Sequence, residues 1–250
     1  MKVQIYTIQS VEEALEVVSV GVDNIGITPS SIGLPGEISY ETAKDICEKV
    51  DTGTKVALSV SSNIDEIIEM AMFVNPDVLH LCGEPGELDV NGVKSLKERL
   101  NKLNKELPIM QAISVDDMGA LDFAKEYEEI SDYFILDTST TAVQGVGASG
   151  NVHDWNVSKA IVDSVSIPVV LAGGLSPDNI QKAISIVHPW GVDSLTHTNK
   201  FLNDGSFIKA IKLIDAAKKS GAEIVKFQCH ILEKEMIKTC LLYTSPSPRD

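Results

Sequence analysis

A pair of glycines at the end of a short apolar segment is the part of the sequence best suited to binding an anion. Residues 168–172 are rich in β-branched side chains and too few for a helix, which predicts a strand buried on both faces. Gly173 and Gly174 follow directly. Glycines at a strand exit let bare backbone N–H groups approach a phosphate, although the same pair is also compatible with a simple tight turn.

The residues after the glycines predict a helix and a second strand. Ser176 is a candidate N-cap, and Pro177 suits the first position of a helix. The second strand is expected over residues 192–198, where it brings the hydroxyl group of Thr196 and the imidazole of His197 to its end. Strand ends in such a unit form a phosphate-sized pocket. We therefore expect Thr196 and His197 to complete the phosphate site, the alternative for His197 being a hydrogen-bonded loop residue.

The second chemical candidate is the carboxyl group of Asp137. Residues 133–136 predict a strand, and Asp137 follows at its exit, before a long glycine-containing loop over residues 138–154. A carboxyl group in this position can transfer protons as a general acid. The alternative is that Asp137 only caps the loop.

The elements that must position these groups alternate along the whole chain. Strands are expected over residues 3–8, 24–28, 55–60, 78–81, 108–115, 133–136, 168–172 and 192–198. Helices are expected over residues 11–20, 39–50, 64–74, 91–102, 120–130, 156–165 and 206–219, with one more beginning at Ser176. Such repetition gives an open doubly wound sheet or a closed barrel. Eight units with polar residues at the strand exits favour an α/β fold of the (β/α)8 TIM barrel type, in one domain over residues 1–220.

Composition excludes several classes of partner. The chain has 250 residues, of which 44% are hydrophobic and 23% charged, with a net charge of −15 and a pI near 4.7. This acidity argues against nucleic acid and anionic membranes, which need a basic face. The apolar runs are strand-sized, the start shows no signal peptide, and the four cysteines form no CxxC pair. We therefore expect a cytoplasmic protein without a membrane span, a zinc site or a disulfide framework.

Two motifs resemble the phosphoribosylanthranilate isomerase family. One is Leu-Ala-Gly-Gly-Leu followed by Pro-x-Asn, at residues 171–179, and the other is Ile-Leu-Asp-Thr, at residues 135–138, before a glycine loop that ends in Asp-Trp. The resemblance covers roughly residues 3–199. It implies an eight-stranded barrel that performs an Amadori rearrangement of a phosphorylated aminoaldose in tryptophan biosynthesis, without cofactor or metal. It also implies that Asp137 is the general acid and that the glycine pair binds the phosphate.

Other positions depart from the family pattern. The family has its base, a cysteine, in Lys-Ile-Cys-Gly on the first strand, where this chain has Gln-Ile-Tyr-Thr, so that Tyr6 takes the place of the base. The family's arginine after the second strand, which grips the anthranilate carboxylate, has no counterpart in residues 30–36. After the fourth strand the family has Leu-His-Gly, where this chain has Leu-Cys-Gly with Cys82 in the middle. After the eighth strand the family has Ser-Ser-Gly, where this chain has Leu-Thr-His at residues 195–197.

The missing base leaves several groups to consider. A phenol with a pKa of about 10 is a poor base at neutral pH, so Tyr6 is a weak replacement and its alternative role is packing at the barrel mouth. Cys82, His80 and His197 replace the base only if they face that mouth. The alternatives are that Cys82 is a small buried filler and that His80, in the middle of a strand, belongs to the core.

The C-terminal part carries two further resemblances. Residues 203–239 are similar to the start of N-acetylneuraminate synthase, and residues 240–250 resemble a translated sequencing adapter. We therefore expect a non-barrel tail, with a chimeric extra segment over residues 221–239 and an artefactual disordered end over residues 240–250, from a metagenomic gene prediction. The alternative is a natural extension with a disordered end.

Three functions remain open from the sequence. The first is isomerisation of phosphoribosylanthranilate; the second is another phosphosugar isomerase or epimerase; the third is a non-catalytic barrel that binds a phosphorylated metabolite. In each case the expected partner is a small phosphorylated sugar, and the protein is expected to be a monomer or homodimer. Loss of the base and of the carboxylate clamp is what keeps the second and third alternatives open.

Overall fold

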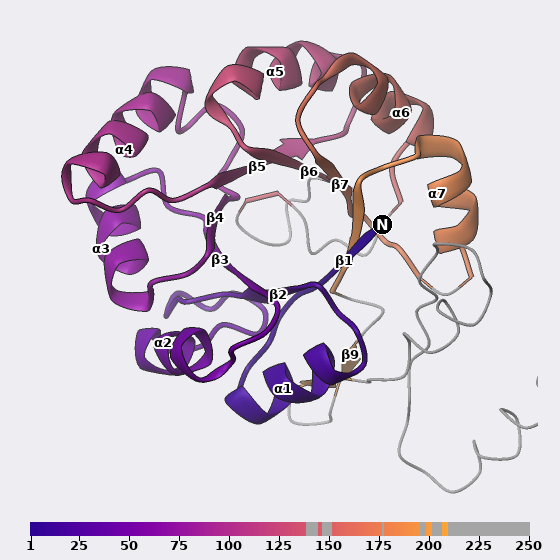
Figure 1. Cartoon of the computed structure of the whole chain (residues 1–250). Coiled ribbons are helices and arrows are strands. Elements are labelled where there is room, and N and C mark those ends of the chain that lie inside the picture. Colours follow the sequence, from indigo (N-terminus) through magenta and orange to yellow (C-terminus); the bar gives the residue numbers. More distant parts are fainter. Residues whose placement is uncertain (139–144, 147–151, 177, 196–198, 202–206, 210–250) are drawn as a thin grey trace, which may run out of the picture.

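Eight parallel strands close into a barrel in chain order, with helices around its outside (Figure 1). The computed structural model describes residues 1–138, 145–146, 152–176, 178–195, 199–201 and 207–209. The strands are β1 (Lys2–Ile5), β2 (Asn24–Ile27), β3 (Thr54–Ser59), β4 (Val78–Leu81), β5 (Ile109–Ser114), β6 (Tyr133–Asp137), β7 (Val169–Leu171) and β8 (Gly191–Ser194). β8 pairs with β1 and closes the ring. The predicted (β/α)8 barrel is confirmed.

The helices begin where the sequence supplies capping side chains. They are α1 (Val11–Ser19), α2 (Tyr40–Lys49), α3 (Ile64–Val74), α4 (Val90–Lys102), α5 (Gly119–Tyr127), the short 3-10 helix η1 (Glu128–Ile130), α6 (Trp155–Ser164) and α7 (Ile180–Val187). The side chains of Ser10, Ser39 and Asn63 accept hydrogen bonds from first-turn N–H groups. Because every strand runs the same way, the exits of all eight strands gather at one end of the barrel.

Hydrophobic side chains form two cores, one inside the barrel and one between the strands and the helices. Alternation along β4 illustrates the division: Leu79 and Leu81 belong to the outer core, whereas Val78 and Cys82 belong to the inner one. Side chains therefore fill the barrel interior up to the level of the strand exits. A side chain at an inward position near an exit has no room below it and must face the barrel mouth.

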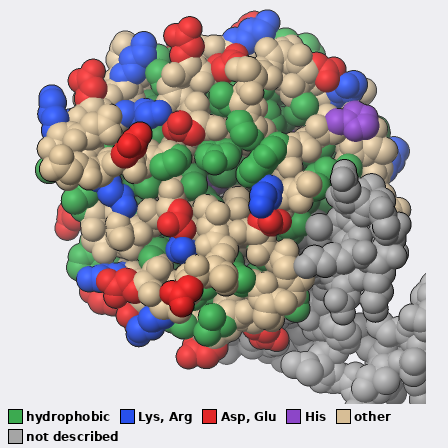
Figure 2. Space-filling view, viewed as in Figure 1, with side chains coloured by type: hydrophobic (Ala, Val, Ile, Leu, Met, Phe, Trp, Pro, Cys, Tyr) green, Lys and Arg blue, Asp and Glu red, His purple; other side chains and the backbone are tan. Residues whose placement is uncertain are grey.

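The opposite end of the barrel carries the N-terminus and faces the viewer in Figure 1. In the same view, Figure 2 shows hydrophobic side chains gathered near the centre of this face, with side chains of both charges around them. Among the described residues, no helix has the length and apolar character needed to cross a bilayer.

Two predictions about the C-terminal third of the chain are wrong. Ser176 does not cap α7, which begins later, at Ile180; instead the Ser176 N–H donates to the side-chain oxygen of Asn179, which occupies the N-cap position. The predicted helix over residues 206–219 begins with a strand, β10 (Phe207–Lys209), antiparallel to β9 (Asn199–Phe201). The sequence between the two strands contains Asn-Asp-Gly, a type of sequence that favours antiparallel pairing of the segments on either side over a helix.

The remaining predictions for this region cannot be compared with the structure. Residues 210–250 lie outside the described part of the chain, and with them the domain limit at residue 220, the segment 221–239 and the end 240–250. They stay predictions.

Candidate active site

A pocket opens at the strand exits, with a volume of about 600 Å³ including its mouth. Its walls come from the ends of β1, β2, β3, β4, β6 and β8 and from the loops after β2 and β6. The lining side chains are Tyr6, Thr7, Thr28, Leu34, Pro35, Leu58, Val60, His80, Cys82, Ile135, Asp137, Val146, Asp193 and Leu195. Three of the predicted catalytic candidates, Asp137, Cys82 and Tyr6, thus share one pocket. The fourth, His197, lies outside the described residues, as does Thr196.

Asp137 is the last residue of β6, and its carboxyl group faces the pocket. Burial raises the pKa of Asp137 to about 7, and a hydrogen bond of 2.7 Å from the Thr138 N–H to Oδ1 partly offsets that rise. A pKa of this value leaves a large fraction of the group protonated at neutral pH. Asp137 therefore has a proton to donate, which is the property a general acid needs.

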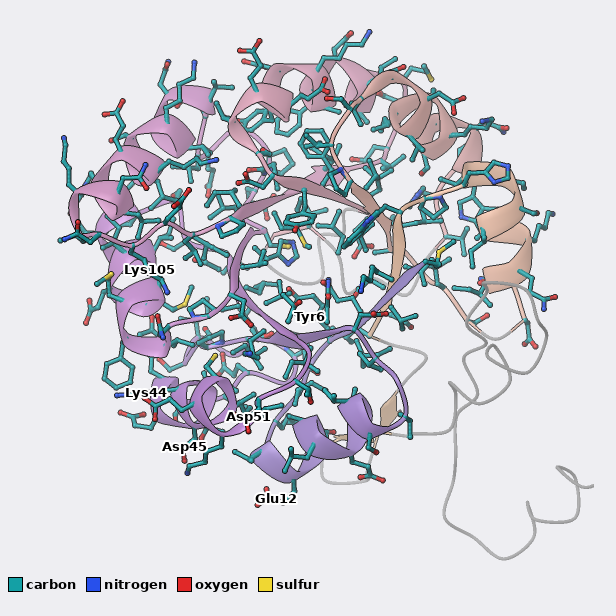
Figure 3. The ribbon with its side chains drawn as sticks, in the orientation of Figure 1. Tyr6, Glu12, Lys44, Asp45, Asp51 and Lys105 are labelled. Atoms are coloured by element: carbon teal, nitrogen blue, oxygen red, sulfur yellow. The ribbon has the colours of Figure 1, made fainter. Side chains whose placement is uncertain are left out.

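Tyr6 leaves β1 and crosses the barrel interior toward β4. Figure 3 shows it inside the ring of strands, and its hydroxyl group lies 2.7 Å from Nδ1 of His80. The crossing needs Gly26 on β2, because a Cβ at Gly26 would lie 2.3 Å from the Tyr6 ring. Burial, and then the charge of Asp193, raise the Tyr6 pKa well above 10, so the phenol stays protonated.

His80 is buried, as the core alternative predicts, but it also lines the pocket. Burial lowers the pKa of His80 to about 3, which keeps the imidazole neutral. Its Nε2 atom has no hydrogen-bond partner among the described residues, and the same holds for Oγ1 of Thr7 on the adjoining wall. Buried polar atoms without partners are uncommon in native proteins, so both atoms are suited to hold hydroxyl or carbonyl groups of a ligand.

Cys82, at the exit of β4, is hydrogen-bonded to Val146, a residue between β6 and α6 in the sequence. Its thiol donates to the carbonyl oxygen of Val146 over 2.7 Å, and the Val146 N–H donates back to the Cys82 carbonyl oxygen. The Gly145 N–H is bound by a carboxylate oxygen of Glu84 at 3.0 Å. Burial, and then the charge of Asp137, raise the pKa of Cys82 to about 12. Cys82 is therefore a neutral donor that holds Val146 in the wall of the pocket.

The glycine pair lies at the exit of β7, next to β6. Gly173 and Gly174 have φ angles of 78° and 58°, which glycine adopts far more readily than other residues. Gly173 packs so closely on Thr138 and His153 that a Cβ would lie 3.0 Å from Oγ1 of the former and 2.7 Å from Nδ1 of the latter. The side chain of Asn179 closes the turn by donating to the Gly174 carbonyl oxygen. Gly173 and Gly174 are not among the described residues that line the pocket of Asp137. A glycine turn has bare backbone N–H groups that an anion can approach.

The loop after β2 presents an apolar wall to the pocket, through Leu34 and Pro35. Its own carboxylate, Glu37, accepts hydrogen bonds of 3.0 Å from the N–H groups of Ile32, Gly33 and Leu34. These N–H groups are therefore occupied by the protein itself. Among the described lining residues the pocket has no lysine or arginine, and its carboxyl groups are those of Asp137 and Asp193.

Asp193 is the functional candidate that the sequence reasoning did not select. It lies on β8, is 5% exposed and lines the same pocket as Asp137. The signal was present, because a carboxylate in a buried strand needs a partner or a role. Among the described residues, no group of three or more His, Cys, Asp or Glu side chains is placed to hold a metal ion.

Comparison with known proteins places this site in a family. The family model described as N-(5′-phosphoribosyl)anthranilate (PRA) isomerase matches residues 3–194. The chain belongs to the PRA isomerase family. It is 30% identical to N-(5′-phosphoribosyl)anthranilate isomerase 2 of Methanosarcina mazei over 223 residues, which are 87% of this chain and 94% of that protein. It is 30% identical to the isomerase of Haloferax volcanii over 69% of this chain and 73% of that one.

Solved PRA isomerases have the same barrel. The enzyme of Thermotoga maritima superposes with a TM-score of 0.64 at 26% identity, over 80% of this chain and 90% of that chain. A further PRA isomerase structure, at 25% identity and a TM-score of 0.63, is a complex with reduced 1-(o-carboxyphenylamino)-1-deoxyribulose 5-phosphate. The likeness to thiamine phosphate pyrophosphorylase of Pyrococcus furiosus, at 21% identity and a TM-score of 0.53, concerns the fold alone.

Proposed function

We propose that this chain isomerises N-(5′-phosphoribosyl)anthranilate, a step of tryptophan biosynthesis, to the corresponding 1-amino-1-deoxyribulose phosphate. The observation that carries the proposal is Asp137, a carboxyl group with a pKa of about 7 in a pocket at the strand exits of a PRA isomerase barrel. The family match and the names of the relatives support this reaction over the two alternatives, a different phosphosugar isomerase and a non-catalytic binding barrel.

Asp137 acts in the first half of the reaction. Its proton passes to the ring oxygen of the ribose, the bond from that oxygen to C1′ breaks, and the amine lone pair forms a C1′–N double bond. A donor with a pKa near the working pH suits this step, because it is protonated in much of the free protein and still gives up its proton readily.

The glycine turn is the proposed phosphate site. Gly173 and Gly174 form a turn whose bare backbone N–H groups an anion can approach, and the exit of β7 lies next to that of β6, which carries Asp137. Thr196 and His197 remain proposed members of this site. Binding through backbone dipoles is compatible with the acidic net charge, because the local donors and not the total charge determine the affinity.

The anthranilate ring is proposed to lie against Leu34 and Pro35. This wall supplies apolar contact but no cation for the carboxylate of the substrate, since the nearby N–H groups are bound to Glu37. Figure 3 shows the labelled Lys44 and Lys105 among the helices outside the ring of strands, away from Tyr6. We therefore expect turnover with weak substrate binding. We further propose a cytoplasmic enzyme that is a monomer or homodimer; one solved relative is described as dimeric.

The test is turnover of synthetic phosphoribosylanthranilate by the purified full chain, with the ketone product quantified by chromatography. Wild-type protein and the control Asp163→Asn, an exposed residue of α6 outside the pocket, are expected to form product at equal rates. Asp137→Asn is expected to lower kcat by about 10²–10⁴-fold. Absence of turnover in a folded wild-type protein at millimolar substrate would refute the proposal.

A further inference from the structure

We propose that Asp193 is the catalytic base of this chain, the group that removes the C2′ proton in place of the family's cysteine. The inference rests on the proposed function, because it assigns the second half of the same reaction. It is based on the position of Asp193 in the barrel and on the hydrogen bonds and protonation of the other candidates among the described lining residues.

Asp193 lies beside the exit of β1. The parallel pairing of β8 with β1 sets Asp193 opposite Gln4 and Ser194 opposite Ile5, and Tyr6 follows directly after Ile5. The charge of Asp193 raises the pKa values of both Tyr6 and Cys82, so the carboxylate lies near both side chains. It therefore borders Tyr6, the position that the resemblance assigns to the base, and it shares the pocket with both Tyr6 and Asp137.

The other candidates carry their protons or bind them weakly. Tyr6 is a protonated phenol whose hydroxyl group is hydrogen-bonded to His80. The thiol of Cys82 donates to Val146. His80 is neutral, but with a pKa of about 3 it holds a proton too weakly to be an effective base near pH 7. A carboxylate is the remaining type of proton acceptor in the described part of the pocket, and Asp137 is committed to donating a proton.

The proposed step balances without any co-reactant. Once Asp137 has opened the ring, C1′ is part of a C1′–N double bond. The Asp193 carboxylate takes the proton from C2′, the electron pair of that C–H bond forms a C1′–C2′ double bond, and the nitrogen regains its lone pair. The resulting enol tautomerises: C1′ gains a proton and the C2′ hydroxyl group loses one, which leaves the ketone. No atom is oxidised by an outside reagent, since the aldose end is reduced as C2′ is oxidised.

The test compares Asp193→Asn with wild-type protein in the full chain, with Asp163→Asn as the control outside the pocket. Asp193→Asn is expected to lower kcat for phosphoribosylanthranilate by about 10²–10⁴-fold while KM changes less than about threefold. Thermal melting checks that the variant is folded. A folded Asp193→Asn variant whose kcat stays within about threefold of wild type would overturn the proposal.

Two further measurements separate a base from a structural residue. Ring opening and closing interconverts the α and β anomers, which NMR magnetisation transfer detects; Asp193→Asn is expected to keep this catalysis, and Asp137→Asn to lose it. Formate, a small carboxylate, is expected to restore turnover to Asp193→Ala at least tenfold, and no rescue in a folded variant would overturn the assignment. Absence of turnover in wild-type protein would instead refute the proposed function. The failure of the proposed function is therefore distinguishable from the failure of the Asp193 assignment.

Discussion

Replacing Asp137 by Asn should make the protein more stable at alkaline pH while it lowers activity. The substitution keeps the shape of the side chain and an oxygen that accepts the hydrogen bond from the Thr138 N–H. What it removes is a carboxyl group that burial makes costly to ionise. Residues that serve chemistry at the expense of stability are expected at active sites.

The size of the effect follows from the pKa of Asp137, which burial raises from 3.8 to about 7. At 1.36 kcal/mol per pKa unit, this rise corresponds to an upper limit of about 4 kcal/mol on the free energy of unfolding. Because the carboxyl group faces a pocket that water enters, we expect a gain of about 1–2 kcal/mol, or about 3–6 °C in Tm for a chain of this length.

The stability difference between the Asn variant and wild-type protein depends on pH. A raised folded-state pKa means that the folded protein prefers the protonated carboxyl group, so wild-type protein loses stability as pH rises from about 4 to about 7. The Asn variant does not titrate there. The difference in Tm between variant and wild type should therefore be near zero at pH 4 and largest above pH 7, as measured by thermal unfolding monitored with circular dichroism. An equal difference at both pH values, or a variant less stable at pH 8, would refute the reasoning.

Three other substitutions test the site. Gly26→Ala should lower the free energy of unfolding by about 1–3 kcal/mol, because the new methyl group overlaps the Tyr6 ring. In a protein that already carries Tyr6→Cys, the same substitution should lower it by less than about 1 kcal/mol. Equal losses in the two backgrounds, measured by urea unfolding, would contradict this contact. Leu34→Arg should lower KM for phosphoribosylanthranilate about tenfold by pairing with its carboxylate, and an unchanged KM would place the aryl group elsewhere. Gly173→Ala, checked for folding, should raise KM more than it lowers kcat, whereas the reverse would argue against a phosphate turn.

The barrel was predictable because local signals agree with the global fold. Strand-like and helix-like periods alternate, and capping residues such as Ser10, Ser39 and Asn63 mark the helix starts. The rule that strand exits meet at one end then brought Asp137 and the glycine pair to the same rim. The helical pattern over residues 206–219 predicts a helix where the structure has β10, because such a pattern carries no information about pairing with β9.

The remaining part of the site depends on contacts across the barrel, which no local pattern reveals. The Tyr6–His80 hydrogen bond joins β1 to β4, and it exists because Gly26 on a third strand leaves room for the ring. The bond between Cys82 and Val146 likewise joins residues 64 positions apart. The sequence could indicate that Asp193 is a carboxylate within a buried strand. Its position near the exit of β1 depends on the register in which β8 pairs with β1, and no local pattern reveals that register.

The pH dependence of kcat/KM for phosphoribosylanthranilate, measured on the purified full chain, tests the central claim most directly. If protonated Asp137 opens the ribose ring, kcat/KM should fall about tenfold per pH unit above about pH 7, the pKa to which burial raises this group. A kcat/KM that stays constant or rises between about pH 7 and pH 9 would contradict the assignment of Asp137 as the acid.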